Sequence, residues 1–255
     1  MVIDYQSQRV LVTGGGSGIG KALAEALAAR GAHVIVADVN AVDVEAVAAT
    51  INGEAITCDV ADPAAPARLI AAASERGSLT LVCSNAGIGR NKRVLNESDE
   101  EIARVFAVNF SAGVRLAQAY AATLGEGARG RMLFTGSENS LSIPAAVRGR
   151  GLGAYAASKH ALLAAAEWLR DEARQLDVHV LLPGAVYTPL ISKHLPDPKL
   201  APPGLGLIMP ERCAELALKG MDLGLFYIPT HAHIAADMRA RGEGVAAALA
   251  ALDLG

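Results

Sequence analysis

Short runs rich in Val, Ile and Leu alternate along this chain with longer, Ala-rich stretches. The short runs have the length and apolar content of buried strands, whereas the longer stretches repeat apolar residues with the period of a helix. Strands are predicted at residues 9–13, 33–37, 54–58, 79–83, 131–135, 178–182 and 225–229. Helices are predicted near residues 18–30, 41–51, 64–76, 98–124, 154–176 and 210–222.

This alternation predicts an α/β fold. Strands that are apolar along their whole length are typical of a parallel sheet covered by helices on both faces. The right-handed crossover rule then favours a doubly wound, Rossmann-type sheet of about seven strands. We expect one domain over residues 1–255, because the chain shows no internal repeat and no linker-like composition before residue 189.

Two irregular segments and the C-terminal tail depart from the alternation. Residues 142–153 hold several turn-forming residues, and residues 188–210 hold six prolines. Both segments follow predicted strands, so we expect them at the ligand-binding edge of the sheet. Long irregular segments often act as lids there, and residues 188–210 are interpreted as a lid over the substrate. Residues 231–255 are interpreted as a divergent tail with a loop and one or two helices.

The composition excludes several classes of protein. Apolar residues make up 52% of the 255 residues, which allows a sizeable core. The net charge is −3 without a basic block, so nucleic acid is not expected as a partner. Three cysteines without paired spacing suit a reducing compartment. The polar N-terminus, and the lack of an apolar run of about 18 residues, predict a cytoplasmic protein that does not engage a membrane.

The most specific local motif is GGGSGIGK, between the first predicted strand and the first predicted helix. Glycines at such a turn let a ligand approach the backbone, and the helix N-terminus presents free N–H groups to a phosphate. The motif fits the pattern T-G-x-x-x-G-x-G of a dinucleotide loop. The predicted loop residues are Thr13, Gly14, Ser17, Gly18, Ile19 and Gly20.

A nucleoside-triphosphate loop is an alternative, since Gly15, Gly20 and Lys21 match part of its pattern. That loop needs Ser or Thr after the lysine to hold Mg²⁺, whereas Ala22 has no side-chain oxygen. A glycine-rich turn without any ligand is the third possibility.

The second predicted strand leads to Asp38, 18 residues after Gly20. An acid at this place accepts hydrogen bonds from the adenosine ribose and repels a 2′-phosphate. One such charge pair about 4 Å apart is worth roughly 4 kcal/mol at an effective dielectric constant of about 20. Residues 14–20 and 39–40 hold no Arg or Lys. The cofactor is therefore predicted to be NAD rather than NADP, with a capping role at the strand end as the alternative for Asp38.

Further motifs follow in order, and together they resemble the short-chain dehydrogenase/reductase family over about residues 9–190. They are CDV (58–60), SNAGIG (84–89), AVNFSAG (107–113), FTGSENS (134–140), YAASK (155–159) and PGAVYT (183–188). The resemblance implies cofactor contacts from Asp59, Val60, Asn85, Ala86, Gly87, Tyr155, Lys159, Pro183, Gly184, Val186 and Thr188. It implies a catalytic set of Asn109, Ser137, Tyr155 and Lys159.

The catalytic set has a chemical rationale. Tyr155 and Lys159 are spaced i and i+4, so they share one helix face. A phenol with a pKa of about 10 is a weak base at neutral pH, but a nearby ammonium and an oxidised nicotinamide favour the phenolate. Tyr155 is then expected to take the alcohol proton while Ser137 hydrogen-bonds the substrate oxygen. The resemblance also implies that Lys159 binds the nicotinamide ribose and that Asn109 holds a water in the proton relay.

The spacing within the catalytic set departs from the family pattern. Ser137 precedes Tyr155 by 18 residues, which is more than is usual in the family. The excess lies in residues 142–153, so either this loop bulges outward or Ser140 or Ser142 takes the role. We favour Ser137 because it directly follows the fifth strand.

Other polar residues suggest weaker hypotheses. Arg148 and Arg150 are candidates to bind an acidic substrate, although solvated loop charges are the favoured interpretation. His231 and His233 have no Cys or carboxylate motif beside them, so structural roles and no metal site are expected. Residues 245–252 pack either on the core of their own chain or on a partner. A homodimer is expected, with a homotetramer as the alternative.

The sequence therefore predicts an NAD-dependent oxidoreductase that interconverts a secondary alcohol and its ketone. The Leu, Ile, Met and Pro content of residues 188–210 favours a small, fairly apolar substrate, aromatic or alicyclic. A non-catalytic dinucleotide sensor on the same fold is the alternative. That protein would be expected to lack Tyr155 or Lys159, and both are present.

Overall fold

Seven strands pair into one parallel sheet in this computed structural model, which describes residues 2–89, 92–144, 147–149 and 151–254. Within these ranges the strand order is β3-β2-β1-β4-β5-β6-β7, and every neighbouring pair is parallel. The strands are β1 (Arg9–Thr13), β2 (His33–Asp38), β3 (Glu54–Thr57), β4 (Leu79–Ser84), β5 (Gly130–Thr135), β6 (Leu176–Leu182) and β7 (Tyr227–Pro229). The strand bounds predicted from the sequence agree within two residues.

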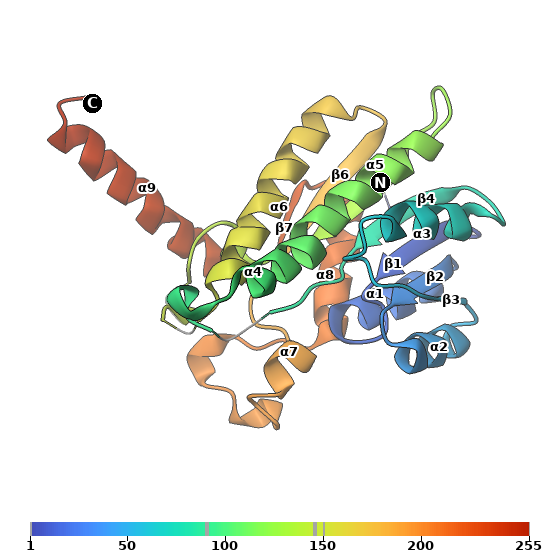
Figure 1. Ribbon diagram of the computed structural model, residues 1–255, viewed down its shortest axis with the longest axis horizontal. Coiled ribbons are helices and arrows are strands. Elements are labelled where there is room, and N and C mark those ends of the chain that lie inside the picture. The colour runs from blue at the N-terminus through green and yellow to red at the C-terminus, as the bar shows by residue number, and fades with distance from the viewer. Residues whose placement is uncertain (1, 90–91, 145–146, 150, 255) are drawn as a thin grey trace.

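Helices cover both faces of this sheet (Figure 1). Alternate residues of β1 show why both faces are apolar: Val10 and Val12 join one buried cluster, and Leu11 joins another. The first cluster includes side chains of α1 (Gly18–Ala29), α2 (Ala41–Thr50) and α8 (Pro210–Asp222). The second includes side chains of α3 (Ala65–Ser74), α5 (Ala112–Thr123) and α6 (Gly153–Glu172). The predicted doubly wound α/β fold is confirmed.

The order of the strands determines where a ligand site can form. The chain runs from β1 outward to β3 and then returns to β4, on the opposite side of β1. The connections after β1 and β4 therefore diverge to opposite faces and leave a crevice at the carboxyl ends of these strands. The glycine motif after β1 and the SNAGIG motif after β4 both lie at this crevice.

The single helix expected over residues 98–124 is divided in the structure. The stretch consists of α4 (Asp99–Phe106), the π-helical turn η2 (Ala107–Ser111) and α5. Ser98 and Glu101 form a capping box that fixes the start of α4. The π turn contains Asn109, and single π turns inside longer helices frequently occur at functional sites. Side-chain periodicity alone does not distinguish such a wide turn from an α-helical one.

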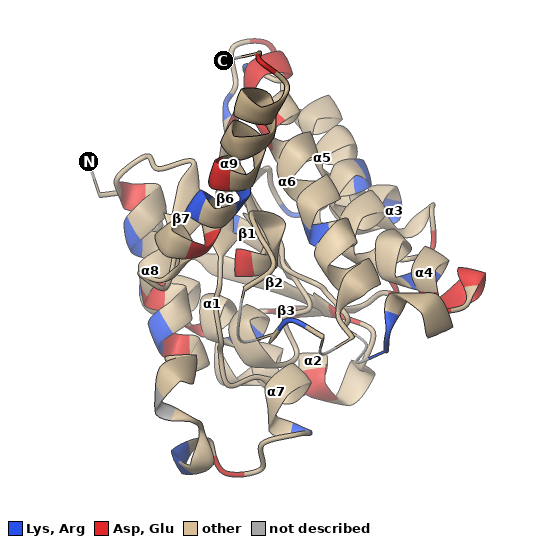
Figure 2. Ribbon diagram, turned by 90° about the vertical axis from the view of Figure 1, so that its left-hand side faces the viewer, with Lys and Arg blue, Asp and Glu red and all other residues tan. Residues whose placement is uncertain are grey.

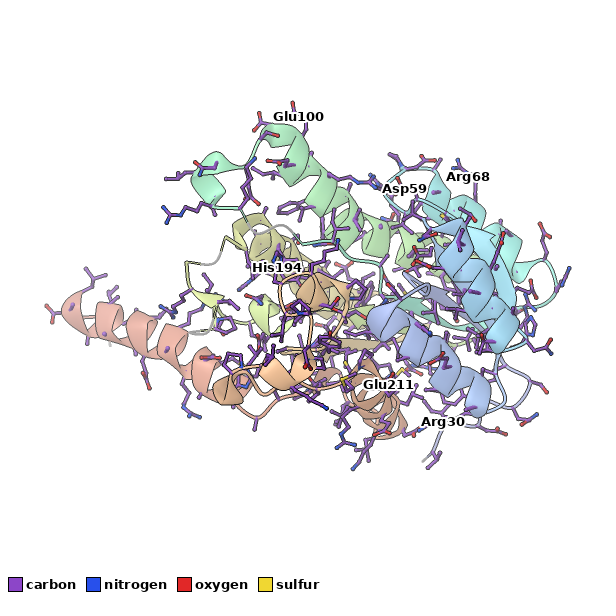
Figure 3. The ribbon with its side chains drawn as sticks, turned by 90° about the horizontal axis from the view of Figure 1, so that it is seen from below. Arg30, Asp59, Arg68, Glu100, His194 and Glu211 are labelled. Atoms are coloured by element: carbon purple, nitrogen blue, oxygen red, sulfur yellow. The ribbon has the colours of Figure 1, made fainter. Side chains whose placement is uncertain are left out.

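The segment after β6 leaves the body of the protein and returns to it. Val186 pairs with Ile208 in an isolated parallel bridge, so the two ends of this segment lie side by side. Within it lie the one-turn helix α7 (Pro189–Ser192) and the 3-10 turns η5 (Pro198–Leu200) and η6 (Pro203–Leu205). Seen from below, the part that carries His194 crosses the middle of the view, between α1 and α4 (Figure 3).

The tail forms the helix α9 (Ile234–Ala251), which projects away from the body (Figure 1). Ile234 is the only residue of α9 that is buried, and residues 245–252 are exposed throughout. The alternative in which residues 245–252 pack on their own core is therefore wrong. Segments with Lys and Arg are interspersed with segments with Asp and Glu along the ribbon in Figure 2. Among the described residues no helix has the length and apolarity needed to cross a bilayer.

Candidate active site

A cleft of about 340 Å³ opens at the carboxyl ends of the strands, at the crevice between β1 and β4. The sequence-predicted site residues that line it are Gly14, Ser17, Gly18, Ile19, Asp38, Asp59, Val60, Asn85, Ala86, Gly87, Ser137, Tyr155, Lys159, Pro183, Gly184, Val186 and Thr188. The other three, Thr13, Gly20 and Asn109, are buried behind this lining. The structure thus brings residues from six separate loops to one place.

The glycine loop has a geometry that only glycine permits. Gly14 and Gly18 have φ angles of +63° and +53°, in the left-handed region. A Cβ on Gly20 would lie 2.0 Å from the carbonyl oxygen of Gly14, so this helix turn packs directly on the loop backbone. Ser17 is the N-cap residue of α1, and its side chain makes no capping hydrogen bond. The first N–H groups of α1 thus donate no hydrogen bond to that side chain and can bind a phosphate.

Thr13 and Asn85 tie this loop to the middle of the sheet. The Thr13 hydroxyl donates to the carbonyl of Cys83 at 3.3 Å and accepts from the backbone N–H groups of Asn85 and Ala86 at 3.0 and 3.3 Å. The Asn85 amide donates to the carbonyls of Thr13 and Gly14 at 3.1 and 3.2 Å. Its oxygen accepts from the Thr135 hydroxyl at 3.0 Å. This Thr13–Asn85 network joins the carboxyl ends of β1, β4 and β5.

Asp38 lies at the end of β2, beside the glycine loop. Its carboxylate accepts hydrogen bonds from the backbone N–H groups of Gly16 and Asn40 at 3.0 and 3.1 Å. A Cβ on Gly16 would lie 3.1 Å from the same carboxylate, so this glycine permits the close approach. Asp38 is partly exposed and faces the cleft. This is the position at which an acid can meet a ribose.

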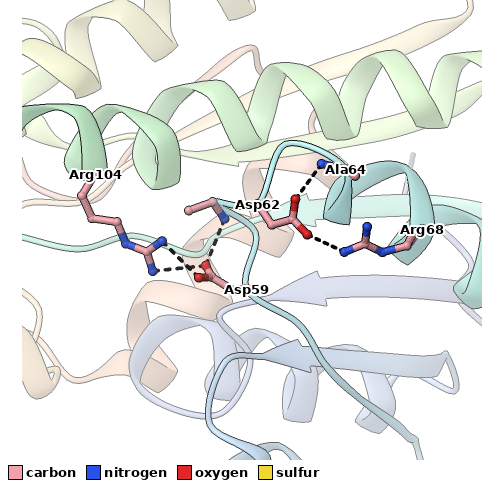
Figure 4. A network of polar contacts seen from close by, with 6 residues as sticks. Asp59, Asp62, Ala64, Arg68 and Arg104 are labelled. Atoms are coloured by element: carbon pink, nitrogen blue, oxygen red, sulfur yellow. Dashed lines mark hydrogen bonds and ion pairs between the residues drawn. The ribbon is translucent and has the colours of Figure 1, made fainter. Parts of the chain in front are cut away.

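Asp59 has a partner that the sequence did not suggest. Arg104 of α4 binds its carboxylate with two hydrogen bonds of 3.0 and 3.2 Å (Figure 4). These bonds are the main reason that the pKa of Asp59 lies below its ordinary value. Arg104 also lines the cleft. The pair is nonlocal, joining residues 45 positions apart, so neither spacing nor periodicity could have shown it.

Ser137 and Tyr155 form the centre of the predicted catalytic set. The Ser137 hydroxyl accepts hydrogen bonds from the Asn139 backbone N–H at 3.1 Å and from its side-chain amide at 3.3 Å. Its own proton is therefore available to a further acceptor. Burial raises the pKa of Tyr155, a hydrogen bond with Ser137 lowers it, and the nearby Glu138 carboxylate raises it. The net result is a Tyr155 pKa above its ordinary value, so the protein alone holds Tyr155 as the neutral phenol. This differs from the lowered pKa that was expected from the adjacent ammonium.

The alternatives to Ser137 are placed less favourably. The Ser140 hydroxyl accepts from the Ser137 backbone N–H at 3.1 Å and is buried, and Ser142 is buried outside the cleft lining. Arg148 also lies outside the cleft lining, and its side chain donates to the carbonyl of Ile143 at 3.3 Å. Arg150 lies outside the described residues. The geometry favours Ser137 for the substrate oxygen.

Lys159 and Asn109 complete the set from two different helices. The Lys159 ammonium donates to the carbonyl of Thr135 at 2.7 Å and lies 5.9 Å from the centre of the Tyr155 ring. Burial lowers the pKa of Lys159 to about 8. Asn109 exchanges two hydrogen bonds with Ile88, at 2.8 and 2.9 Å, and donates to the Ser158 hydroxyl at 3.0 Å. The π turn thus anchors the loop that follows β4 against α6.

The loop after β6 forms the opposite wall of the cleft. Thr188 packs on Gly18, where a Cβ would lie 3.0 Å from its methyl group. The Leu190 side chain packs on Gly89, where a Cβ would lie 2.8 Å from it. Leu190, Ile191 and Ile88 line the cleft and were not predicted as site residues. The sequence placed residues 188–210 over the substrate without singling out Leu190 or Ile191, and it gave no sign that Ile88 lines the cleft.

Comparison with known proteins assigns the family. The short chain dehydrogenase family model matches residues 8–199, and the chain belongs to this family. The 1-deoxy-11-beta-hydroxypentalenate dehydrogenase of Streptomyces exfoliatus is 36% identical over 239 residues, which cover 89% of this chain and 84% of that protein.

Two solved structures extend the comparison to the cofactor. A short-chain dehydrogenase/reductase from Burkholderia phymatum in complex with NAD has a TM-score of 0.84 and 26% identity, with 95% of each chain covered. A short-chain dehydrogenase from Sphingobium yanoikuyae in complex with NADPH has a TM-score of 0.78 and 25% identity, with 96% of this chain and 94% of that one covered. Membership of this family and the phosphate-binding cradle formed by the glycine loop together support a nicotinamide dinucleotide as the cofactor class.

Gly20→Ala is expected to abolish measurable dinucleotide binding. The added methyl group meets the Gly14 carbonyl at 2.0 Å, so the loop must open and its N–H groups no longer converge. Calorimetric titration with NAD⁺ measures the loss. Gly125→Ala is the matched control, because no atom lies within 4 Å of its Cβ position. An unchanged affinity of the Gly20 variant would contradict this account of the cradle.

Proposed function

We propose that this protein interconverts a secondary alcohol and its ketone, with NAD as the hydride carrier. The observation that best supports this function is that Ser137, Tyr155 and Lys159 line the same cleft, with the Lys159 ammonium 5.9 Å from the centre of the tyrosine ring. An alcohol oxygen in this position meets a proton acceptor and a hydrogen-bond donor together. That pairing is what removal of a hydride from a carbinol carbon requires.

Each of these residues has a distinct task in the proposed reaction. Tyr155 accepts the alcohol proton during oxidation and returns it during reduction. Ser137 donates its proton to the substrate oxygen, because Asn139 occupies its acceptor sites. Lys159, with a pKa of about 8, is mostly protonated at neutral pH and favours the phenolate. An oxidised nicotinamide bound in the cleft supplies the hydride acceptor and a positive charge with the same effect.

The preference for NAD over NADP is supported by the charge at the ribose end of the cleft. Asp38 is hydrogen-bonded in place by Gly16 and Asn40, so its charge is fixed beside the loop. The cleft also contains Arg104, a cation that would attract a phosphate. Both guanidinium hydrogen bonds of Arg104 are directed at Asp59, which offsets its charge.

A fairly apolar substrate is supported by apolar side chains that line the cleft. Ile88, Leu190 and Ile191 line the cleft, and two of them belong to the 188–210 segment. The two ends of that segment are paired through Val186 and Ile208. Paired ends are what a lid needs in order to move as one piece. The similar Streptomyces exfoliatus enzyme is a dehydrogenase named for a hydroxylated compound, which supports an alcohol as the reduced substrate.

Tyr155→Phe is expected to lower kcat for alcohol oxidation by roughly 10²–10⁴, because it removes the proton acceptor. The measurement is the formation of reduced nicotinamide with NAD⁺ and a panel of apolar secondary alcohols. Tyr227→Phe is the control: it removes a tyrosine hydroxyl bonded to Glu167 on the surface and leaves the rate unchanged. Tight NAD⁺ binding without turnover of any alcohol or ketone would instead favour a dinucleotide sensor.

Asp38→Asn is expected to shift the ratio of kcat/KM for NADP⁺ to that for NAD⁺ upward by about tenfold or more. The variant keeps the shape of the side chain but removes its charge and one of its two acceptor oxygens, and each factor of ten in the ratio corresponds to about 1.4 kcal/mol. Asp62→Asn, at an acid that pairs with Arg68 outside the cleft lining, is the control. Wild-type protein that prefers NADP⁺ would overturn the role given to Asp38.

A further inference from the structure

A carboxylate that the mechanism does not use lies next to the catalytic set. Glu138 follows Ser137 in the 3-10 turn η3 (Glu138–Ser140), and its backbone N–H donates to the carbonyl of Pro183 at 2.8 Å. The side chain is 12% exposed. Its carboxylate lies against Gly184, where a Cβ would be 2.9 Å from Oε2. Glu138 is absent from the residues that line the cleft.

The C-terminal segment supplies the partner of this carboxylate. His233, the residue that precedes α9, has its Nε2 atom 2.7 Å from Oε2 of Glu138. The two residues are 95 positions apart in the chain. The contact therefore joins the tail to the loop that holds Ser137.

A second hydrogen-bonded chain holds His231, whose ring lies beside that of His233. The Thr230 hydroxyl accepts from the Gly184 backbone N–H at 3.1 Å, which leaves its proton to donate to Nδ1 of His231 at 2.7 Å. Nε2 of His231 then donates to the carbonyl of Gly206 at 2.7 Å. The rings of His231 and His233 lie 5.3 Å apart. Residues 230–233 thus connect the loop after β6, the 188–210 segment and Glu138.

We propose that Glu138 and His233 are positioning residues that set the charge facing Tyr155, and with it the pH range of the reaction. The proposal rests on the function proposed above, in which Tyr155 exchanges the proton. Neither residue touches the cleft, so both act through Tyr155.

The electrostatic basis is the set of charged and polar groups around the tyrosine hydroxyl. The Glu138 carboxylate raises the pKa of Tyr155, while the Ser137 hydroxyl lowers it. Lys159 of α6 is the cation beside the ring. Glu138 itself is faced by His233, whose ring N–H reduces the negative field that reaches Tyr155. Removing the Glu138 carboxylate and removing its partner His233 should therefore shift the pKa of Tyr155 in opposite directions.

The first test is the pH profile of kcat/KM for alcohol oxidation in Glu138→Gln. Without the carboxylate the phenolate forms more readily, so the acidic limb moves to lower pH. We expect kcat/KM on that limb to rise about threefold relative to its value on the alkaline plateau. A profile of unchanged shape, even with a lower overall rate, would show a merely structural role and overturn the proposal.

The second test uses His233→Ala, which leaves the Glu138 charge without its partner. The acidic limb is expected to move to higher pH in the wild-type background and to stay in place in the Glu138→Gln background, because His233 acts through Glu138. Arg241→Gln is the control: it breaks a different contact of the tail, with His160 at 2.9 Å, and should leave the profile unchanged. A shift of equal size in both backgrounds would contradict the coupling. If His233→Ala does not fold, the Glu138→Gln profile decides alone.

A titration without turnover separates this proposal from the proposed function. Tyrosinate absorbance of the NAD⁺ complex is followed against pH, with Tyr155→Phe subtracted to isolate the Tyr155 signal. Ionisation of Tyr155 at lower pH in Glu138→Gln supports the pair even when no alcohol on the panel is oxidised. The same midpoint in both proteins would refute the pair, whichever alcohol proves to be the substrate.

Discussion

The Thr13–Asn85 network is the constraint on which the rest of this structure depends. It joins the carboxyl ends of β1, β4 and β5 through side-chain hydrogen bonds to backbone groups of the loops. A parallel sheet leaves backbone groups without partners where its strands end, and a buried group without a partner costs about 1–3 kcal/mol. One threonine and one asparagine satisfy several such groups at the point where the connections diverge. The crevice is therefore held open by hydrogen bonds within its own wall.

The same network links the two ends of the cleft. On one side it holds the Gly14 carbonyl, against which Gly20 packs to form the phosphate cradle. On the other side it holds Thr135, whose backbone carbonyl accepts from the Lys159 ammonium at 2.7 Å. The residues that would bind the pyrophosphate and the lysine proposed to favour the tyrosinate thus share one support. A change in the network is expected to reach binding and chemistry together.

Local patterns in the sequence predicted most of this arrangement, and nonlocal contacts account for what they missed. The strands, the glycine loop and the Tyr155–Lys159 spacing each lie within a few residues, so their physical reasons are visible in the sequence. The Asp59–Arg104 pair, the packing of Leu190 on Gly89 and the contact of His233 with Glu138 depend on how distant segments meet. His233 illustrates this limit, because nothing in the spacing of the two histidines indicated that it would contact Glu138.

Chemical denaturation of wild-type protein and Asn85→Ala, each with and without saturating NAD⁺, tests the central claim most directly. The variant loses its bonds to Thr13, Gly14 and Thr135, so its free energy of unfolding is expected to fall by about 2–3 kcal/mol. NAD⁺ should stabilise the wild type by mass action and the variant much less, because the cradle is no longer held. An Asn85→Ala protein as stable as the wild type, and equally stabilised by NAD⁺, would contradict the account.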